Sequence, residues 1–130
     1  MPACPEWYEL RDLVADKKFE EAAALLARQP SLRIAVNGIG ETVLHYLAVE
    51  NDEQGVSWLL LQGFDINTRN KFGTPVVFEV AQLDHKGLLG WFISKGADMK
   101  CRDKDGKDIK EYVLDFGHKE IAKHLESLGI

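Results

Sequence analysis

The sequence is poor in cysteine and lacks long apolar runs. Its two cysteines, Cys4 and Cys101, are far apart and form no Cys-x-x-Cys pair, so we expect neither a disulfide framework nor a zinc site, and a reducing compartment is the simplest setting. No stretch approaches the roughly 18 apolar residues that a membrane span needs. The opening MPACPEWYELRDLV lacks the basic-then-apolar order of a secretory signal. We therefore expect a cytoplasmic protein.

An excess of positive charge is also lacking. The formal net charge is −5, which disfavours affinity for nucleic acid or anionic membrane, because both require a basic surface. The charge is uneven, with a net of −6 over residues 1–66 and +1 over residues 67–130. A length of 130 residues with 45% hydrophobic residues suits a single globular domain spanning 1–130.

Catalytic motifs are missing as well. There is no Gly-x-Ser-x-Gly elbow and no phosphate-binding glycine loop, and no two of the four histidines have the i, i+4 spacing of metal ligands. Lys100 and Arg102 flank Cys101 and could lower its thiol pKa, but a small structural residue is the favoured interpretation of this cysteine. Asp103 and Asp105 share a turn with lysines and look solvated. We expect no enzyme activity, no cofactor and no metal.

What the sequence does contain is a period of 33 residues. Glycines recur at 40, 73 and 106 and again at 63, 96 and 129, while Trp58 and Trp91 keep the same spacing. Glycine closes tight turns and ends helices because it adopts positive φ without a Cβ clash. The period therefore indicates a repeat architecture.

Each period has the order turn, helix, short turn, helix, glycine. We expect helices over 42–50, 55–62, 75–83 and 84–95, with Thr42 capping the first of them and Asn51-Asp52 ending it. Two further helices, 7–17 and 19–29, form a first unit without the glycines, as terminal capping units often do. The units run over about 7–36, 37–69, 70–102 and 103–130.

These units resemble ankyrin repeats, whose pattern is Asp-x-x-Gly-x-Thr-Pro-Leu-His-x-Ala-Ala followed by a helix and Gly-Ala-Asp. The second unit matches at Gly40, Thr42, Leu44, His45 and Ala48, and the third ends in Gly96-Ala97-Asp98. The Thr-Pro-Leu-His segment is degraded to PVVF in the third unit and to DIKE in the fourth. The resemblance implies an all-α solenoid of stacked helix-turn-helix units with turn or hairpin tips.

The resemblance also gives each histidine a structural place. It implies that His45 points inward and hydrogen-bonds backbone of the adjoining turn. His85 and His118 take the position that opens the second helix of a unit, and His124 lies on the last helix. A buried imidazole with satisfied nitrogens needs no catalytic role to explain it.

Ankyrin repeats bind partners through a concave face of turn tips and first helices. In this sequence the resemblance places that face on Ile39, Glu41, Val49 and Glu50, on Arg69, Lys71, Phe72, Thr74, Gln82 and Leu83, and on Arg102, Lys104, Asp105, Lys107, Asp115 and Phe116. The apolar members Ile39, Phe72 and Phe116 are candidate anchors, although Phe116 could instead pack under the final loop. The tips from Arg69 to Lys107 form a basic row, for which an ordinary solvated turn is the alternative interpretation.

We therefore expect a monomeric protein–protein interaction module. One role that fits is a dedicated inhibitor or immunity protein for a toxic enzyme, since a net charge of −5 suits a basic target. There are two alternatives. One is a scaffold subunit that inhibits neither of its partners, and the other is an enzyme that uses Cys101 or a histidine.

Overall fold

The computed structural model describes residues 4–130 and shows the expected all-α architecture. Its helices are α1 (Pro5–Ala15), α2 (Phe19–Arg28), η1 (Pro30–Arg33), α3 (Val43–Val49), α4 (Glu53–Leu61), α5 (Val76–Gln82), α6 (Lys86–Ser94), α7 (Ile109–Asp115) and α8 (Lys119–Ser127). Over this range the only β pairing is an isolated bridge between Arg69 and Pro75. No helix of the described range is both long and apolar enough to cross a membrane.

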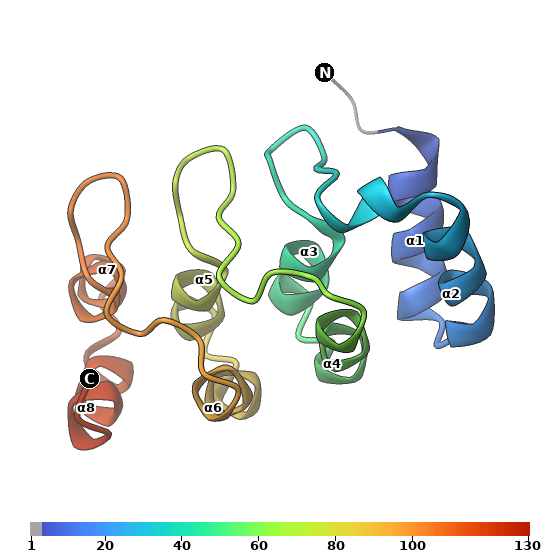
Figure 1. Ribbon diagram of the computed structural model, residues 1–130. Coiled ribbons are helices and arrows are strands. Elements are labelled where there is room, and N and C mark those ends of the chain that lie inside the picture. Colours follow the sequence, from blue (N-terminus) through green and yellow to red (C-terminus); the bar gives the residue numbers. More distant parts are fainter. Residues whose placement is uncertain (1–3) are drawn as a thin grey trace.

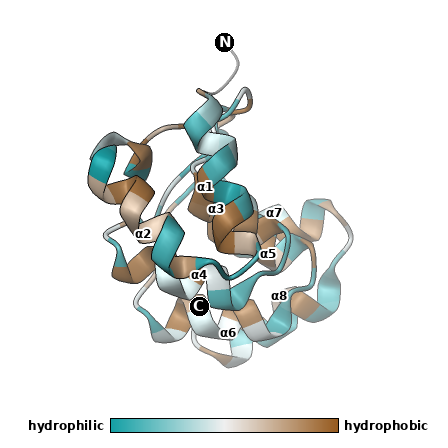
Figure 2. Ribbon diagram, turned by 90° about the vertical axis from the view of Figure 1, so that its right-hand side faces the viewer, coloured by the Kyte–Doolittle hydropathy of each residue, from teal (hydrophilic) through white to brown (hydrophobic). Residues whose placement is uncertain are grey.

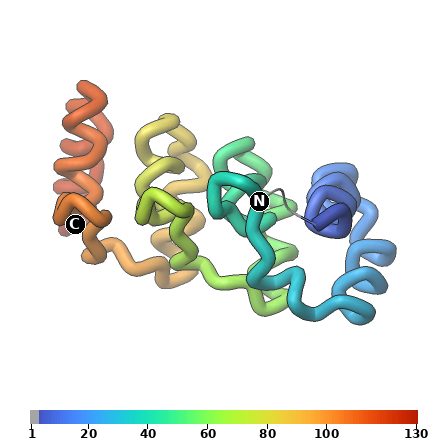
Figure 3. Tube along the Cα trace, turned by 90° about the horizontal axis from the view of Figure 1, so that it is seen from above, coloured from blue at the N-terminus to red at the C-terminus, as the bar shows by residue number. Residues whose placement is uncertain are grey.

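The helices form four pairs that stand side by side (Figure 1). The first helices α1, α3, α5 and α7 pack on one another in a row, and each also packs on the second helix of its own pair. The loops that precede α3, α5 and α7 project to the same side of the molecule. Seen from above, their tips lie in front of the row of first helices (Figure 3). This is the expected solenoid.

The core is continuous along the row of pairs. Trp7, Phe78 and Phe92 are among its fully buried side chains and come from the first and third pairs, and apolar residues line the helix faces that meet inside (Figure 2). Burying one such side chain contributes about 1.5–3 kcal/mol. The indole Nε1 of Trp7 donates a hydrogen bond to the Glu41 carbonyl at 3.2 Å and so fixes α1 to the turn before α3.

Turn chemistry sets the helix boundaries. Thr42 caps α3 by accepting a hydrogen bond from the His45 amide at 3.2 Å, as the sequence predicted. The backbone after the first helices turns left-handed, with φ of 63° at Asn51, 62° at Asp84 and 80° at Gly117, three residues spaced by 33. Asn and Asp tolerate this conformation better than other side chains, so the helices end there.

Neighbouring loops are in direct contact. The Lys71 amide donates to the Ile39 carbonyl at 3.0 Å. Gly40 lies beside this bond with φ +78°, and a Cβ added to it would come within 2.4 Å of the Lys71 nitrogen. The close packing of these two tips therefore requires glycine.

Candidate protein-binding surface

Each projecting loop is organised by its first side chain. Asn37, Asn70 and Asp103 each use Oδ1 to accept two backbone N–H groups, those of the residues two and four positions later. An Asx residue at this place fixes the turn without help from the rest of the fold. The three tips therefore present their side chains on a preformed backbone.

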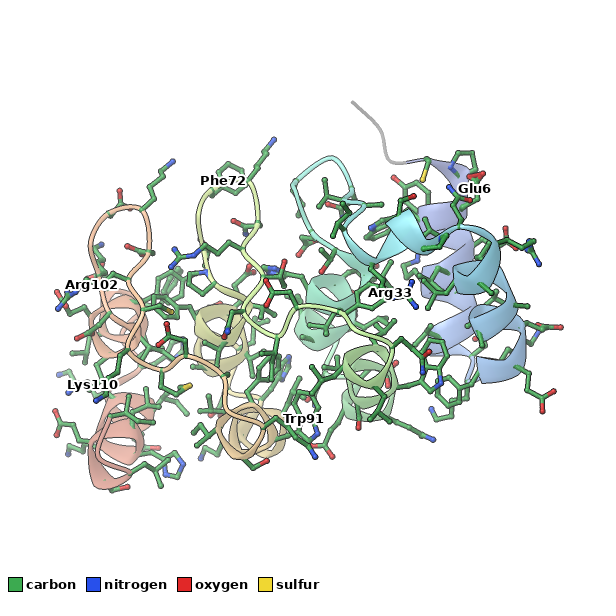
Figure 4. The ribbon with its side chains drawn as sticks, viewed as in Figure 1. Glu6, Arg33, Phe72, Trp91, Arg102 and Lys110 are labelled. Atoms are coloured by element: carbon green, nitrogen blue, oxygen red, sulfur yellow. The ribbon has the colours of Figure 1, made fainter. Side chains whose placement is uncertain are left out.

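Two large apolar side chains lie at these tips. Ile39 is 45% exposed and Phe72 is 52% exposed, and Phe72 points away from the helices (Figure 4). The Lys71 ammonium lies 5.2 Å from the centroid of the Phe72 ring, within the range of a cation–π contact. The structure thus brings three of the predicted site residues together.

The two predicted arginines serve the tips themselves. Arg69 donates from Nη1 to the Gly73 carbonyl at 3.0 Å, and Arg102 repeats this bond to the Gly106 carbonyl at 2.9 Å. Both side chains remain exposed. They brace their own loops while leaving part of the guanidinium available to solvent.

The basic row is weaker than the sequence suggested. Lys107 pairs with Asp115, and this carboxylate raises the pKa of the lysine and offsets its charge. Lys71 and Lys104 are exposed and make no ion pair with any residue in the range 4–130. These two lysines and Arg69 carry the positive potential of the tips, because Arg102 pairs with Glu111 at 3.5 Å.

A second row lies where the first helices end. Glu50, Leu83 and Phe116 directly follow α3, α5 and α7 at the same position of each unit, and all are exposed. Phe116 does not pack under the final loop, because its ring is 53% exposed and contacts Tyr112 at 5.1 Å between centroids. Gln82, one residue before Leu83, is half-buried.

Tyr112 lies beside Phe116 and is half-buried. Burial, followed by the charges of Glu79 and Asp103, raises its pKa to about 12. The phenol is therefore neutral at physiological pH and acts as a hydrogen-bonding aromatic surface beside Phe116.

The expectation that Glu41 is exposed is wrong. It is only 5% exposed, because its carboxylate turns back into the loop and accepts a hydrogen bond from the Asn37 amide at 3.1 Å. Its place at a tip, read from the repeat pattern, did not reveal this inward turn. Glu41 is therefore not available as a surface contact.

The partner of His45 also differs from the expectation. The side chain is fully buried, but its Nε2 lies 2.7 Å from Glu79 Oε1 in the next unit and 3.8 Å from Glu41 Oε2, rather than against backbone of the adjoining turn. Glu79 in turn accepts from the Asn70 side chain at 3.1 Å. His85 instead meets backbone of the preceding unit, with Nε2 3.0 Å from the Val49 carbonyl.

Sequence reasoning missed this His45 environment because its members come from two units. Glu79 occupies the position that Tyr46 and Tyr112 hold in the neighbouring units. The sequence did hold one signal for this contact. A carboxylate replaces an aromatic residue at this repeat position, one unit after a buried histidine.

Cys101 is a half-buried free cysteine. Burial, followed by the charge of Asp98, raises its pKa, while Arg69 acts more weakly in the opposite direction. Its Sγ lies 3.2 Å from the Asp98 carbonyl oxygen. The geometry therefore favours the structural interpretation of Cys101 over that of a thiol activated by flanking cations.

The first unit contributes a surface for which the sequence gave no candidate residues. The Arg11 guanidinium lies 5.2 Å from the Tyr8 ring and 5.3 Å from the Tyr46 ring, so it bridges α1 and α3. Asp12, which pairs with Arg11 at 2.9 Å, and Glu50 line the groove between these helices. This end of the surface is aromatic and acidic, whereas the tips are apolar and basic.

Comparison with known proteins identifies the repeat. Residues 39–71 match the ankyrin repeat family, from the Ile39 tip through α3 and α4 to the next tip. The segment 39–71 is an ankyrin repeat. The match covers one ankyrin repeat, and the assignment of the other three helix pairs as repeats rests on their spacing and stays a prediction. No curated protein matches the sequence. Ankyrin repeats are protein–protein interaction modules, so the matched repeat indicates that this chain binds other proteins.

Proposed function

We propose that this ankyrin-repeat protein, acting as a monomer, binds one dedicated protein partner through its tips and the ends of its first helices. The observation that supports this most directly is the exposure of Ile39, Phe72 and Phe116 on that side of the stack. Large aromatic residues beside cations are frequent energetic anchors of interfaces. A solvated loop gains nothing from exposing them.

The charge distribution bears on the kind of partner. The tips carry Lys71 and Lys104, whereas the groove between α1 and α3 carries Asp12 and Glu50. A partner whose own surface changes sign along its length would meet both ends favourably, which sets register and speeds encounter. The excess of acid, −5 for the chain, favours a partner that is basic overall.

An inhibitor of a toxic basic enzyme, acting in the cytoplasm, satisfies these conditions. Such an enzyme needs a cationic surface when its substrate is anionic, and an acidic stack that covers this surface blocks access. Equimolar ankyrin-repeat protein should then abolish the activity of the enzyme it binds. Full activity in a saturated complex would eliminate the inhibitor role and leave binding alone.

A scaffold is the second candidate, and one observation favours it. Leu61 at the end of α4 is 80% exposed and Leu128 after α8 is 49% exposed, and both belong to the second-helix side. A scaffold would use this side for a second partner. An inhibitor would leave it free.

One capture experiment separates these possibilities. Immobilised wild type, Phe72→Ala and the matched control Leu61→Ala are exposed to lysate of the source organism, and retained proteins are identified and quantified. We expect one stoichiometric partner that Phe72→Ala retains at least 10-fold less strongly, which corresponds to about 1.4 kcal/mol, and that Leu61→Ala retains fully. Two partners, each lost with a different variant, would establish the scaffold. A partner indifferent to Phe72→Ala would refute the assigned face.

A further inference from the structure

We propose that Glu41, His45 and Glu79 form a zinc site that links the second and third units. Each offers one ligand atom, and these atoms lie within 4.8 Å of one another. A histidine nitrogen with carboxylate oxygens is a ligand set that zinc accepts. The spacing of histidines along the sequence predicted no metal, but that criterion does not detect ligands brought together from two units.

The distances suit the ion. Ligand atoms at about 2.0–2.2 Å from a tetrahedral zinc are about 3.3–3.6 Å apart. His45 Nε2 lies 2.7 Å from Glu79 Oε1 and 3.8 Å from Glu41 Oε2, so the two distances bracket that range. Side-chain rotations that move these carboxylate oxygens by less than about 1 Å would bring both distances into that range. Three protein ligands leave the fourth position for water.

Charge gives an independent reason. Glu41 and Glu79 side chains are 6% and 21% exposed, and neither pairs with a lysine or arginine anywhere in residues 4–130. Two carboxylates held this close and this far from water repel each other unless positive charge lies between them. A divalent cation supplies that charge at the point where both carboxylates face His45.

The surroundings hold the ligands in place. The side-chain amide of Asn37 donates a hydrogen bond to Glu41 Oε1, and that of Asn70 donates one to Glu79 Oε1, both at 3.1 Å. Hydrogen bonds of this kind orient metal-binding carboxylates. The same asparagines organise the two loops, so the ion would be coupled to the shape of the tips. The partial exposure of Glu79 leaves a route of entry from solvent.

The affinity should be moderate. Coordination through Nε2 places the ring proton on Nδ1, which is buried and has no hydrogen-bond partner. Leaving a buried donor unsatisfied weakens binding by about 10- to 100-fold relative to a supported histidine. We therefore expect a dissociation constant on the order of micromolar rather than the far lower values of structural zinc sites.

Calorimetric titration of Zn²⁺ into EDTA-treated, re-dialysed protein at pH 7.5 tests the site. Wild type should bind one ion, and its thermal stability should rise with the logarithm of the Zn²⁺ concentration once that concentration exceeds the dissociation constant. Glu41→Gln and Glu79→Gln should each weaken binding at least 10-fold. Glu126→Gln removes an exposed carboxylate on α8 that is not one of the proposed ligands, and it should bind Zn²⁺ like wild type. Co²⁺ should give visible absorption bands in wild type that both glutamine variants lose.

Two results would overturn the proposal. One is wild type that binds no Zn²⁺ up to about a hundred times the expected micromolar range. The other is binding that Glu41→Gln and Glu79→Gln leave intact, which would place the ion on exposed histidine or cysteine elsewhere. Circular dichroism of the metal-free variants checks folding, and if Glu79→Gln unfolds, Glu41→Gln decides alone. Partner capture is not used, so this test is independent of the proposed function.

Discussion

At the scale of the residue, Gly40 and Gly106 allow two costs of replacing a glycine to be compared: backbone strain at positive φ and the steric clash of an added Cβ. Both have φ of +78°, but a Cβ would meet the Lys71 backbone nitrogen at 2.4 Å at Gly40 and nothing within 4 Å at Gly106. Gly106→Ala should lower the free energy of unfolding by about 1–2 kcal/mol, the cost of left-handed backbone in a residue with a side chain. Gly40→Ala should cost at least about 1 kcal/mol more, because the tips must also separate.

Urea unfolding at equilibrium measures both values. Gly38→Ala is the control, because its φ is not positive and its Cβ would meet nothing within 4 Å, so its effect should stay within about 0.5 kcal/mol. Equal losses for Gly40→Ala and Gly106→Ala would show that the tips do not hold each other as tightly as the bond between Lys71 and Ile39 implies.

Predictability from sequence is lowest at this scale. The exposure of Phe72 was predicted from its position in the repeat alone. Glu41 and His45 did not follow, because their orientation depends on Asn37 beside them and Glu79 in the next unit. A periodic pattern gives the position of a side chain, but the partners it finds across units depend on the particular residues there.

At the scale of the element, α7 shows how a degraded motif can keep its helix. The fourth unit reads DIKE where the repeat pattern has Thr-Pro-Leu-His. Nevertheless, the Asp108 side chain accepts a hydrogen bond from the Glu111 backbone amide at 2.8 Å, and the Glu111 side chain accepts one from the Asp108 backbone amide at 3.3 Å. This capping box satisfies two amides at the start of the helix. The DIKE segment therefore differs from the repeat pattern in its residues but still caps the start of α7.

Asp108→Ala should consequently lower the free energy of unfolding by about 1 kcal/mol. Asp108→Asn keeps the accepting oxygen and should lose less than half of that. Chemical unfolding of the two variants beside wild type provides the comparison. If asparagine and alanine are equally damaging, the negative charge at the helix start, rather than the hydrogen bond, is what Asp108 contributes.

Elements were the most predictable part of the chain. Glycine and the Asn51-Asp52 pair mark helix ends by backbone preference, which is a local property, and the observed helices lie within a few residues of the expected ranges. Pro75 is an instructive small difference, because it precedes α5 as its N-cap instead of lying in the first turn. Proline fixes its own φ and lacks a backbone N–H at both the N-cap and the first-turn position. The sequence therefore could not distinguish the two positions.

At the scale of the whole molecule, stability should fall from the middle of the stack toward its described C-terminal pair. In a repeat protein each unit is stabilised by its neighbours, so a unit with neighbours on both sides opens least often. α5 packs between α3 and α7, and five of its seven residues are buried. α7 has the same length but only Ile109 and Val113 are buried, and its Leu114 is 47% exposed.

Amide hydrogen exchange read by mass spectrometry compares these matched helices directly. Amides of α7 should exchange at least 10-fold faster than those of α5 after correction for intrinsic rates, a difference of about 1.4 kcal/mol in opening free energy. Equal protection would mean that the stack opens only as a whole, with coupling between units stronger than the difference in burial. Faster exchange in α7 would show that the end carrying Phe116 opens more readily than the middle of the stack, so a partner would meet a surface there that can adapt to it.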